Sequence, residues 1–364
     1  MKIVQICYSG LGGHSGVAFP LVSADLDNKH DWSIGFVGNT SMIPDFKYKC
    51  QDLNIQYEQF KFRFGLPFIQ WFQLFRWLRA INPESIICHN PSFIIPCKFY
   101  SIFYSARLLV VEHTNNKLKR NREWVFSYLS MLLAHVVVTL TPDYRNELKE
   151  KFSLSFQQKK FFIIPNGIDT NIFSFIKKDC AKRSRDQIFR IGMAARFSDS
   201  KKQDLLIEMM KHLNASKPEF SIHLSLAGNG PELIRVKNLV KSYDLGSIIT
   251  FDGLLNESDL AKWYTTLDLY AHASSGETLS ISILQAMSCG VPIIASDVDG
   301  ISNLLNQDET YGLCIDNTDI FFADAASYIS ENASEASLMS DRASAVVKKY
   351  YSNRAMLENY LLLM

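Results

Sequence analysis

The chain has 364 residues, of which 47% are hydrophobic and 21% are charged, and its formal net charge is +1. This composition is ordinary for a soluble globular protein, and the length predicts two domains. The seven cysteines are scattered, odd in number and without a CxxC pair, which argues against a disulfide framework or a zinc site and fits a reducing cytosol. No apolar stretch reaches 18 residues, and the N-terminal sequence MKIVQICYSG has too short an apolar run for a signal peptide. We therefore expect a cytoplasmic protein without a membrane span.

The charges are distributed unevenly along the chain. Residues 1–180 contain 21 Lys and Arg against 14 Asp and Glu, whereas residues 181–364 contain 17 against 23. A basic half beside an acidic half predicts an anionic partner or surface for the first half. Chance asymmetry between two domains is the alternative explanation.

The first half of the chain alternates short apolar runs with helical stretches. It opens with a strand, KIVQICY, followed by a glycine loop, SGLGGHSG, and a helix from about Val17. Further apolar runs are WSIGFVG, SIICHN, RLLVVEHT, HVVVTLT and FFIIPNG. This alternation predicts a parallel sheet with helices on both faces, because continuous Val, Ile and Leu is typical of strands that are covered on both sides.

Residues 174–187, SFIKKDCAKRSRDQ, interrupt the pattern and are interpreted as a linker, because they are charged and long for a strand-to-helix loop. A second series of apolar runs then begins, with FRIGMAAR, SIHLSLAGNG, IITFDGLL, LDLYAHAS, VPIIASD and YGLCI. The sequence thus predicts two doubly wound α/β domains, 1–173 and 188–345, with a C-terminal helix, 346–364, that packs back on the first domain. Ligands of such sheets bind at the carboxyl ends of the strands, so we expect the domains to face each other across a cleft that holds the site.

Two basic residues follow the first strand of the second series. Arg196 ends the run FRIGMAAR, and Lys201 lies five residues later, where the next helix is expected to begin. Such a pair is suited to a diphosphate, which the Arg side chain contacts as a planar fork and the Lys side chain as a point charge. Solvated basic residues at a helix start are the plainer alternative.

A glycine turn follows the second strand of this series. Gly228, Asn229 and Gly230 precede Pro231, a residue that suits the first turn of a helix. A backbone this open allows a flat ligand to approach, although a simple turn explains the same residues.

An acid and an amide flank the start of a helix that is expected near Leu279. Glu277 precedes it and Gln285 lies almost two turns into it. Backbone N–H groups at such a helix start bind phosphate, Glu277 is then placed to accept from sugar hydroxyls, and Gln285 to bond a ribose. A capping acid with a surface glutamine is the structural alternative.

Several motifs in register give these residues a common context. AARFSDSKKQDLLIEMM, LSLAGNGPEL, ITFDGLL and LDLYAHASSGETLSISILQAMSCGVPIIASDVDG follow IIPNGIDTNIF in the chain. Together they resemble the retaining glycosyltransferases of family 4, which have the GT-B architecture of two Rossmann-like domains. The resemblance covers nearly the whole chain and is strongest in residues 161–305.

The resemblance implies roles for residues of the second domain. Arg196 and Lys201 match the family's pair on the donor diphosphate, and Glu277 matches the first glutamate of its two-glutamate motif, which binds the donor sugar. Gln285 occupies the position of the second glutamate, which holds the ribose. Further residues implied at the donor are Gly228, Asn229, Gly230, Thr278, Leu279 and Ser280.

In the first domain, the resemblance implies that His113 reaches the donor sugar. Gly12 and Gly13, in SGLGGHSG, resemble a loop near the phosphate and the acceptor. His89, which follows SIIC, is a further candidate to face the cleft, and a structural role explains it equally well.

The implied activity is metal-independent, retaining transfer of a hexose, without a cofactor, from a nucleotide-diphosphate sugar, with uridine as the expected base. The expected acceptor is a glycan or a polyprenyl-diphosphate-linked lipid of polysaccharide, lipopolysaccharide or glycolipid synthesis. No DxD-type metal pair stands out, so Arg196 and Lys201 would replace a metal. A nucleotide-sugar epimerase or hydrolase, or a non-catalytic sugar-nucleotide-binding subunit, remains an alternative. An NAD-dependent oxidoreductase is disfavoured because SGLGGHSG lacks the G-x-G-x-x-G spacing.

The segment 61–80, KFRFGLPFIQWFQLFRWLRA, is crowded with aromatic and basic residues. A core helix explains it, and so does an interfacial helix on anionic lipid, to which the basic stretch 115–124 would add. The second interpretation places the protein in the cytoplasm at the inner face of the membrane. Nucleic acid is not an expected partner, because no basic module of a known motif type occurs.

Overall fold

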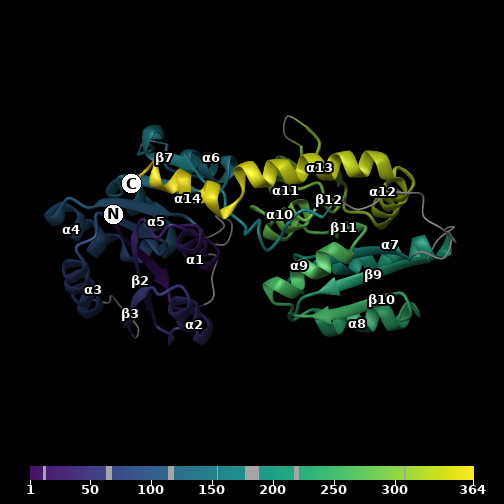
Figure 1. Cartoon of the computed structure of the whole chain (residues 1–364), viewed down its shortest axis with the longest axis horizontal. Helices are drawn as coiled ribbons and strands as arrows, with labels where there is room; N and C mark the ends of the chain where they lie inside the picture. Colours follow the sequence, from purple (N-terminus) through teal and green to yellow (C-terminus); the bar gives the residue numbers. More distant parts are fainter. Residues whose placement is uncertain are drawn as a thin grey trace. The chain divides into compact units, whose positions relative to one another are not determined.

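A computed structural model of the chain describes residues 1–10, 14–62, 68–113, 119–153, 155–176, 188–216, 221–306 and 309–364. The described residues form two compact units (Figure 1). The first unit comprises Met1–Gly167 and Asn353–Met364, and the second comprises Ile168–Ser352. Both ends of the chain therefore lie in the first unit.

The first unit is built on a seven-stranded parallel sheet with the order β3-β2-β1-β4-β5-β6-β7. Its strands are β1 (Lys2–Tyr8), β2 (Asp31–Gly38), β3 (Gln56–Lys61), β4 (Ser85–Cys88), β5 (Arg107–Val111), β6 (Val136–Thr139) and β7 (Phe161–Ile163). The central strands are buried almost throughout, as their continuous apolar sequences predict. The chain reverses its direction of winding between β1 and β4, and this switch point is where doubly wound sheets bind ligands.

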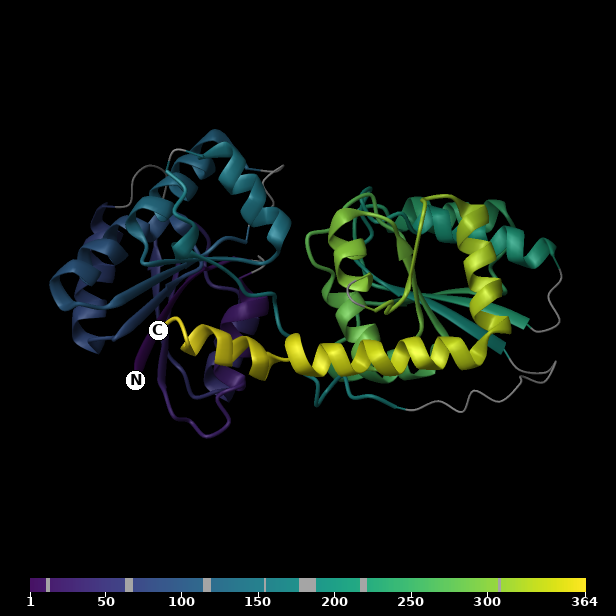
Figure 2. The ribbon, with the colours of Figure 1, turned by 90° about the horizontal axis from the view of Figure 1, so that it is seen from above.

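Helices cover both faces of this sheet (Figure 2). They are α1 (Ser15–Ser23), α2 (Pro44–Asp52), α3 (Phe68–Ile81), α4 (Ile94–Tyr104), α5 (Asn121–Leu133), α6 (Pro142–Lys151) and α14 (Asn353–Leu361), with short 3-10 turns at Pro91–Phe93 and Gln158–Lys160. The C-terminal helix α14 shares a buried core with α1, in which Met356, Leu357 and Tyr360 pack with Val17 and Leu21. Helix α14 is thereby a part of the first unit.

The second unit repeats the same winding in a six-stranded parallel sheet of order β10-β9-β8-β11-β12-β13. Its strands are β8 (Ile188–Ala194), β9 (Ser221–Ala227), β10 (Ile249–Gly253), β11 (Leu269–His272), β12 (Ile293–Ser296) and β13 (Leu313–Ile315). Its helices are α7 (Gln203–Ala215), α8 (Leu233–Ser242), α9 (Glu257–Thr266), α10 (Ile281–Ser288), α11 (Asp299–Leu305), α12 (Asp319–Glu331) and α13 (Ala333–Tyr350). The switch point lies between β8 and β11. The predicted fold class, two Rossmann-like doubly wound α/β domains, is confirmed.

The boundaries between the units differ from the expected ones at 173 and 346. Ile168 and Phe173 are buried in the core of the second unit, and the Ile168 N–H donates to Tyr351 O at 2.8 Å. Val346 and Val347 belong to the same core, so α13 remains in the second unit to its end. The chain thus passes between the units after residues 167 and 352. Residues 177–187 of the expected linker lie outside the described residues.

The described part of the chain contains no helix that is both long and apolar enough to cross a bilayer. Six of the cysteines fall within it, and no disulfide joins any of these six.

Candidate functional site

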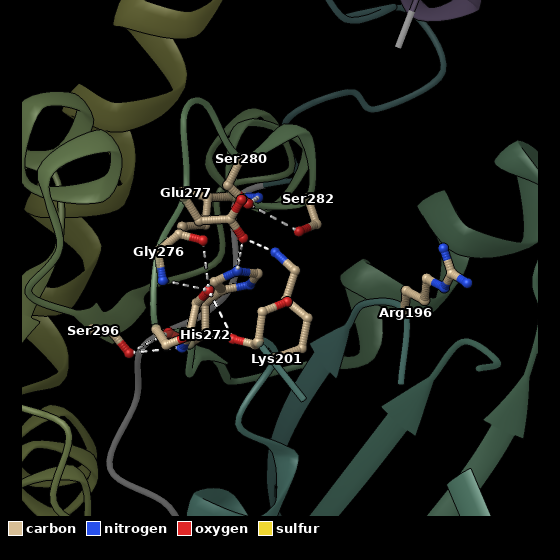
Figure 3. A network of polar contacts seen from close by, with 12 residues as sticks. Arg196, Lys201, His272, Gly276, Glu277, Ser280, Ser282 and Ser296 are labelled. Atoms are coloured by element: carbon tan, nitrogen blue, oxygen red, sulfur yellow. Dashed lines mark hydrogen bonds and ion pairs between the residues drawn. The ribbon is translucent and has the colours of Figure 1, made fainter. Parts of the chain in front are cut away.

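An ion pair joins two of the predicted site residues in the second unit. Lys201 Nζ contacts Glu277 Oε1, and the two side chains are only 20% and 13% exposed (Figure 3). Burial lowers the pKa of Lys201 to about 8, while the adjacent carboxylate favours the charged ammonium. Lys201 therefore offers a partly desolvated cation, whose attraction to an anion is stronger than in bulk water.

The fold brings these two residues together by tying two loops to each other. Strands β8 and β11 are neighbours in the sheet, and Lys201 and Glu277 follow them in the chain. The Lys202 N–H donates to Ala273 O at 3.2 Å, and the Ser275 N–H donates to Ser200 O at 2.9 Å. The ion pair consequently lies at the carboxyl ends of the strands that flank the switch point, where the sequence predicted the site.

A buried histidine, His272, forms a hydrogen bond with the Glu277 carboxylate. His272 is the last residue of β11 and is fully buried, with Nε2 2.9 Å from Glu277 Oε1 and Nδ1 3.1 Å from the Tyr270 hydroxyl. Burial, followed by the charge of Lys201, holds the pKa of His272 well below its usual range, so the ring is neutral and carries a single N–H. A carboxylate only accepts, so Nε2 carries the hydrogen and donates it to Glu277. Nδ1 then carries a lone pair that faces the Tyr270 hydroxyl, whose hydrogen has a second acceptor in Ala194 O at 3.2 Å. Sequence reasoning missed His272, although a polar residue that ends the apolar strand LYAH, five residues before Glu277, is a usable signal.

Further side chains fix the loop between β11 and Glu277. The Ser274 N–H donates to Ser296 Oγ at 2.8 Å, and Asn317 Nδ2 donates to Ser274 O at 2.9 Å. A Cβ atom on Gly300 would lie 2.2 Å from Glu277 O, so only glycine allows this approach. These contacts hold the backbone that carries Glu277 at three neighbouring strand ends, which limits its freedom before any ligand binds.

Helix α10 begins at Ile281, two residues later than expected, because Ser280 caps it. The Ser280 hydroxyl accepts from the Ile283 N–H at 3.4 Å. Thr278 and Leu279 consequently lie in the loop before the helix, and Gln285 lies little more than one turn into it. The start of α10 presents backbone N–H groups beside Glu277, which is the arrangement that binds phosphate.

Gln285 is half-buried and faces the neighbouring helix α9. Its Oε1 accepts from the Tyr264 hydroxyl at 3.4 Å, and the same hydroxyl donates to Ser282 O at 2.9 Å. Gln285 therefore has a protein partner for its carbonyl oxygen, and its amide nitrogen is the group available to a ligand. Its contact with a ribose stays a prediction.

Arg196 is not part of the ion-pair network. It is exposed and follows β8, and its side chain lies apart from Lys201, Glu277 and His272 in Figure 3. Gln203 Nε2 donates to the backbone oxygen of Arg196 at 3.1 Å, which fixes the backbone and leaves the side chain in solvent. The expected clamp of Arg196 with Lys201 is thus not preformed in this structure.

The glycine turn after β9 packs against the backbone that carries Arg196. Gly228 has a φ of +129°, and a Cβ atom there would lie 2.0 Å from Ala195 O. A Cβ atom on Gly230 would lie 2.1 Å from Phe197 O, and Asn229 O accepts from the Phe197 N–H at 3.1 Å. Both glycines are therefore required for close backbone contact within the protein, and the helix that follows begins only at Leu233.

The site residues predicted in the first unit are only partly described. His113 follows β5 at the carboxyl edge of the sheet, and its Nε2 lies 2.9 Å from His89 Nδ1. Gly12 and Gly13 lie outside the described residues. No three His, Cys, Asp or Glu side chains within the described ranges are grouped so that they could hold a metal ion.

Comparison with known proteins identifies the family models and the relatives that this chain matches. The family described as Glycosyltransferase Family 4 matches residues 44–172, and the one described as Glycosyl transferases group 1 matches residues 176–345. D-inositol 3-phosphate glycosyltransferase of Arthrobacter sp. (strain FB24) is 24% identical over 188 residues, which are 50% of this chain and 43% of that relative. Alpha-monoglucosyldiacylglycerol synthase of Streptococcus pneumoniae is 24% identical over 185 residues, which are 49% of this chain and 39% of that relative. The matches thus span less than half the length of these two relatives.

A solved structure agrees over the whole chain. HepE of Anabaena, crystallised in complex with UDP, superposes with a TM-score of 0.81 at 16% identity and covers 100% of this chain and 99% of its own. At this identity the likeness concerns the fold, which is that of a GT-B glycosyltransferase. Two family matches in series, one on each unit, together with this fold, show that the chain belongs to the glycosyltransferases of family 4.

Proposed function

We propose that this chain is a retaining hexosyltransferase that uses a UDP-sugar as donor. The observation that carries the proposal is the Lys201–Glu277 ion pair at the switch point of the second unit, supported by neutral His272. A cation and a carboxylate side by side match a donor that carries a diphosphate next to a polyhydroxylated ring. The UDP bound to HepE of Anabaena supports uridine as the base.

Donor binding divides the two charges between two parts of the ligand. The diphosphate takes Lys201 as its partner, and the N–H groups at the start of α10 add a second source of positive potential. Glu277 is then free to accept from sugar hydroxyls while it keeps the hydrogen bond from His272. Arg196, which is exposed and close in sequence, turns toward the diphosphate to complete the charge balance without a metal.

The same charges lower the barrier to transfer. The bond between the anomeric carbon and the phosphate oxygen breaks, a bond to the acceptor oxygen forms on the same face, and the acceptor proton passes to the departing phosphate. Negative charge grows on the UDP leaving group during this step, and preorganised donors stabilise it most strongly at the transition state. Removal of one such donor typically lowers turnover by about two to three orders of magnitude.

The proposed acceptor is a glycan or a lipid-linked sugar. The similarity to the alpha-monoglucosyldiacylglycerol synthase of S. pneumoniae, whose name gives a glycolipid as its product, supports a lipid-bound acceptor. An apolar surface on α3 and α4 supports contact with a lipid bilayer. Its exposed members are Phe68, Ile69 and Phe72 of α3 and Ile95, Phe99, Ile102 and Phe103 of α4. Phe75 and Phe99 join the two helices through rings whose centroids are 6.0 Å apart.

The charges around this α3–α4 surface fit an anionic bilayer. The two helices contain Arg76, Arg79 and Lys98 and neither Asp nor Glu. Arg76 lies over the Phe72 ring at 6.0 Å, so a cation and an aromatic side chain would reach the headgroup region together. The predicted interfacial helix 61–80 thereby gains α4 as a second contact element, which the sequence had not suggested.

Time-resolved release of UDP, with and without acceptor, tests the proposed activity. Transfer requires that release accelerate when an acceptor is added and that the product retain its anomeric configuration. A hydrolase or an epimerase would turn over the UDP-sugar without an acceptor. A non-catalytic binding subunit would bind UDP and release nothing, so each alternative has its own outcome.

A further inference from the structure

Three polar side chains form a hydrogen-bonded chain at the switch point of the first unit. Gln5 lies in the middle of β1 and is fully buried, and His89, 5% exposed, follows β4. His89 Nε2 is 2.8 Å from Gln5 Oε1, and His89 Nδ1 is 2.9 Å from His113 Nε2. The two imidazole planes are inclined by only 30°, which allows each ring nitrogen to point at its partner. Of these three residues, only His113 has a role that the family resemblance implies.

Gln5, the fully buried member of the three, determines the direction of both hydrogen bonds. Gln5 Nε2 donates to Ala18 O at 2.8 Å, and this contact fixes the orientation of the amide with Oε1 toward His89. An amide oxygen only accepts, so His89 carries its hydrogen on Nε2. In a neutral ring the other nitrogen, Nδ1, is then an acceptor, and it must accept from an N–H at His113 Nε2. His113 Nδ1 is consequently left with a lone pair.

The reverse direction is disfavoured. A hydrogen on His89 Nδ1 would leave its bare Nε2 facing the Gln5 oxygen at 2.8 Å, where two lone pairs repel. A doubly protonated His89 would avoid this, but burial and the nearby rings of His113 and His14 hold the pKa of His89 well below its usual range. Two neutral imidazoles, with His113 donating to His89 and His89 donating to Gln5, satisfy each of these contacts.

We propose that Gln5 and His89 are positioning residues that lock His113 in the Nε2–H tautomer, so that His113 Nδ1 accepts a hydrogen bond from a sugar hydroxyl. An independent observation supports the proposal: His113 Nδ1 is a buried atom without a hydrogen-bond partner among the described residues. It lies at the carboxyl edge of the sheet, where ligands of doubly wound domains bind. The role of the hydroxyl rests on the proposed sugar transfer, whereas the tautomer does not.

The pKa of His113 indicates whether this residue acts as a hydrogen-bond acceptor or as a general base. Burial, followed by His14, lowers the pKa of His113 to about 3, so the ring stays neutral at pH 7. A nitrogen of such low basicity does not retain a proton taken from a hydroxyl, but it still accepts a hydrogen bond. We therefore assign His113 to orienting the sugar, and proton removal to the departing phosphate.

Nitrogen NMR of the full-length chain labelled with 15N-histidine tests the tautomer directly. His113 of the wild type is expected to show a protonated Nε2 and a bare Nδ1, with its resonances assigned from a His113→Asn variant. In Gln5→Glu, the new carboxylate favours a doubly protonated His89, which must donate from Nδ1. His113 Nε2 then accepts, its hydrogen moves to Nδ1, and transfer is expected to fall by about tenfold or more.

Two substitutions of His89 separate positioning from packing. His89→Gln supplies a donor for Gln5 and an acceptor for His113, so it should preserve the His113 tautomer and most of the kcat. His89→Leu keeps the bulk but removes both groups, so His113 should populate both tautomers and kcat should fall about tenfold. His135→Asn, at an exposed position in the same unit, is the matched control. The Asn oxygen can replace His135 Nδ1 as the acceptor for the Leu108 N–H, so this variant should change neither readout. UDP affinity should stay within about twofold in all of these variants, because Lys201 and Gln285, which we propose to bind UDP, lie in the second unit.

A bare Nε2 on wild-type His113 would overturn the proposal. An unchanged His113 tautomer in both Gln5→Glu and His89→Leu would overturn it as well, whatever happens to the activity. If the wild type shows the expected tautomer but transfers no sugar, the proposed function has failed and the assignment of Gln5 and His89 as tautomer-fixing residues stands. Addition of UDP-glucose or UDP-galactose should shift the Nδ1 resonance of His113 when a hydroxyl binds there.

Discussion

His272 Nε2 lies 2.9 Å from Glu277 Oε1, so a fully buried neutral imidazole donates to the carboxylate that also pairs with Lys201. Because the hydrogen bond from His272 does not involve Lys201, we expect it to persist when Lys201 turns away from Glu277. The carboxylate can thus lose its cation to a ligand without losing its orientation. In the proposed function, Lys201 then binds the diphosphate of the donor and Glu277 binds its sugar.

Substitution of the carboxylate tests its assignment to the sugar. Glu277→Gln is expected to lower transfer by about two orders of magnitude, because the carboxylate is assigned to the sugar. UDP contains no donor sugar, so its Kd should change by less than about threefold, and any change should be toward tighter binding, because Lys201 no longer has to leave an ion pair. The amide oxygen still accepts from His272, so the fold is retained. Turnover and calorimetric titration of UDP measure the two effects separately. A large loss of UDP affinity would place Glu277 on the nucleotide.

The buried histidine gives a second prediction. His272→Leu removes the donor to Glu277 and should lower kcat about tenfold to a hundredfold, the usual range for a hydrogen bond to a charged group. Tyr270 retains an acceptor at Ala194 O, 3.2 Å away, so the unfolding temperature should change little relative to the loss of activity. His272→Gln restores an N–H donor and should recover part of kcat. Equal activity of the Leu and Gln variants would show that His272 only fills space.

The lowered pKa of Lys201 predicts how nucleotide binding depends on pH. Because the pKa of Lys201 is about 8 in the folded protein instead of 10.5, its ammonium loses a proton as pH rises through about 8. Above this pH, UDP binding must be coupled to the uptake of one proton by Lys201. The titration of Lys201 should therefore leave UDP affinity constant below pH 7 to 8. Above this range it should lower the affinity by at most about tenfold per pH unit, as expected for one linked proton. Lys201→Arg keeps its charge to high pH and should flatten this limb of the profile. Titrations between pH 7 and 10 decide the matter, and identical slopes in both proteins would exclude Lys201 as the titrating group.

The sequence predicted the layers of the fold better than their boundaries. Continuous apolar runs identify the buried strands and their alternation with helices, because both depend on local pattern. The pairing of Ile168 with Ser352 is set by contacts between segments far apart in the chain, and no local pattern contains it. The same holds for the site. Lys201 and Glu277 each follow a strand, so the sequence pattern identifies them as site residues. The hydrogen bond between His89 and Gln5 depends on β1 and β4 being neighbours in the sheet, which the sequence pattern does not contain.

Gln285 gives a prediction that depends on which of its atoms meets the ligand. Gln285→Leu keeps the volume and removes both polar atoms, so a contact with the ribose would be lost at a cost of about 1–3 kcal/mol of UDP affinity. Tyr264 still donates to Ser282 O, which protects the fold. Gln285→Glu keeps the acceptor for Tyr264 and replaces the Nε2–H donor with a second carboxylate oxygen, which accepts from a ribose hydroxyl. UDP binding should stay within about tenfold of the wild type, because this charged acceptor is opposed by its desolvation and by repulsion from the phosphates. Wild-type affinity in Gln285→Leu would remove this residue from the nucleotide site.

The proposed function requires Lys201 to leave Glu277 and bind the donor diphosphate. Calorimetric titration of UDP into Lys201→Ala tests it most directly, with Lys202→Ala as the matched control, because Lys202 is the next residue and its nearest carboxylate, on Asp199, is 3.9 Å away. Loss of a charge-assisted contact should weaken UDP binding about tenfold to a hundredfold, and turnover should fall by about two orders of magnitude. The control should stay within about twofold of the wild type in both measurements. Wild-type UDP affinity and kcat in Lys201→Ala would show that Lys201 does not bind the donor diphosphate.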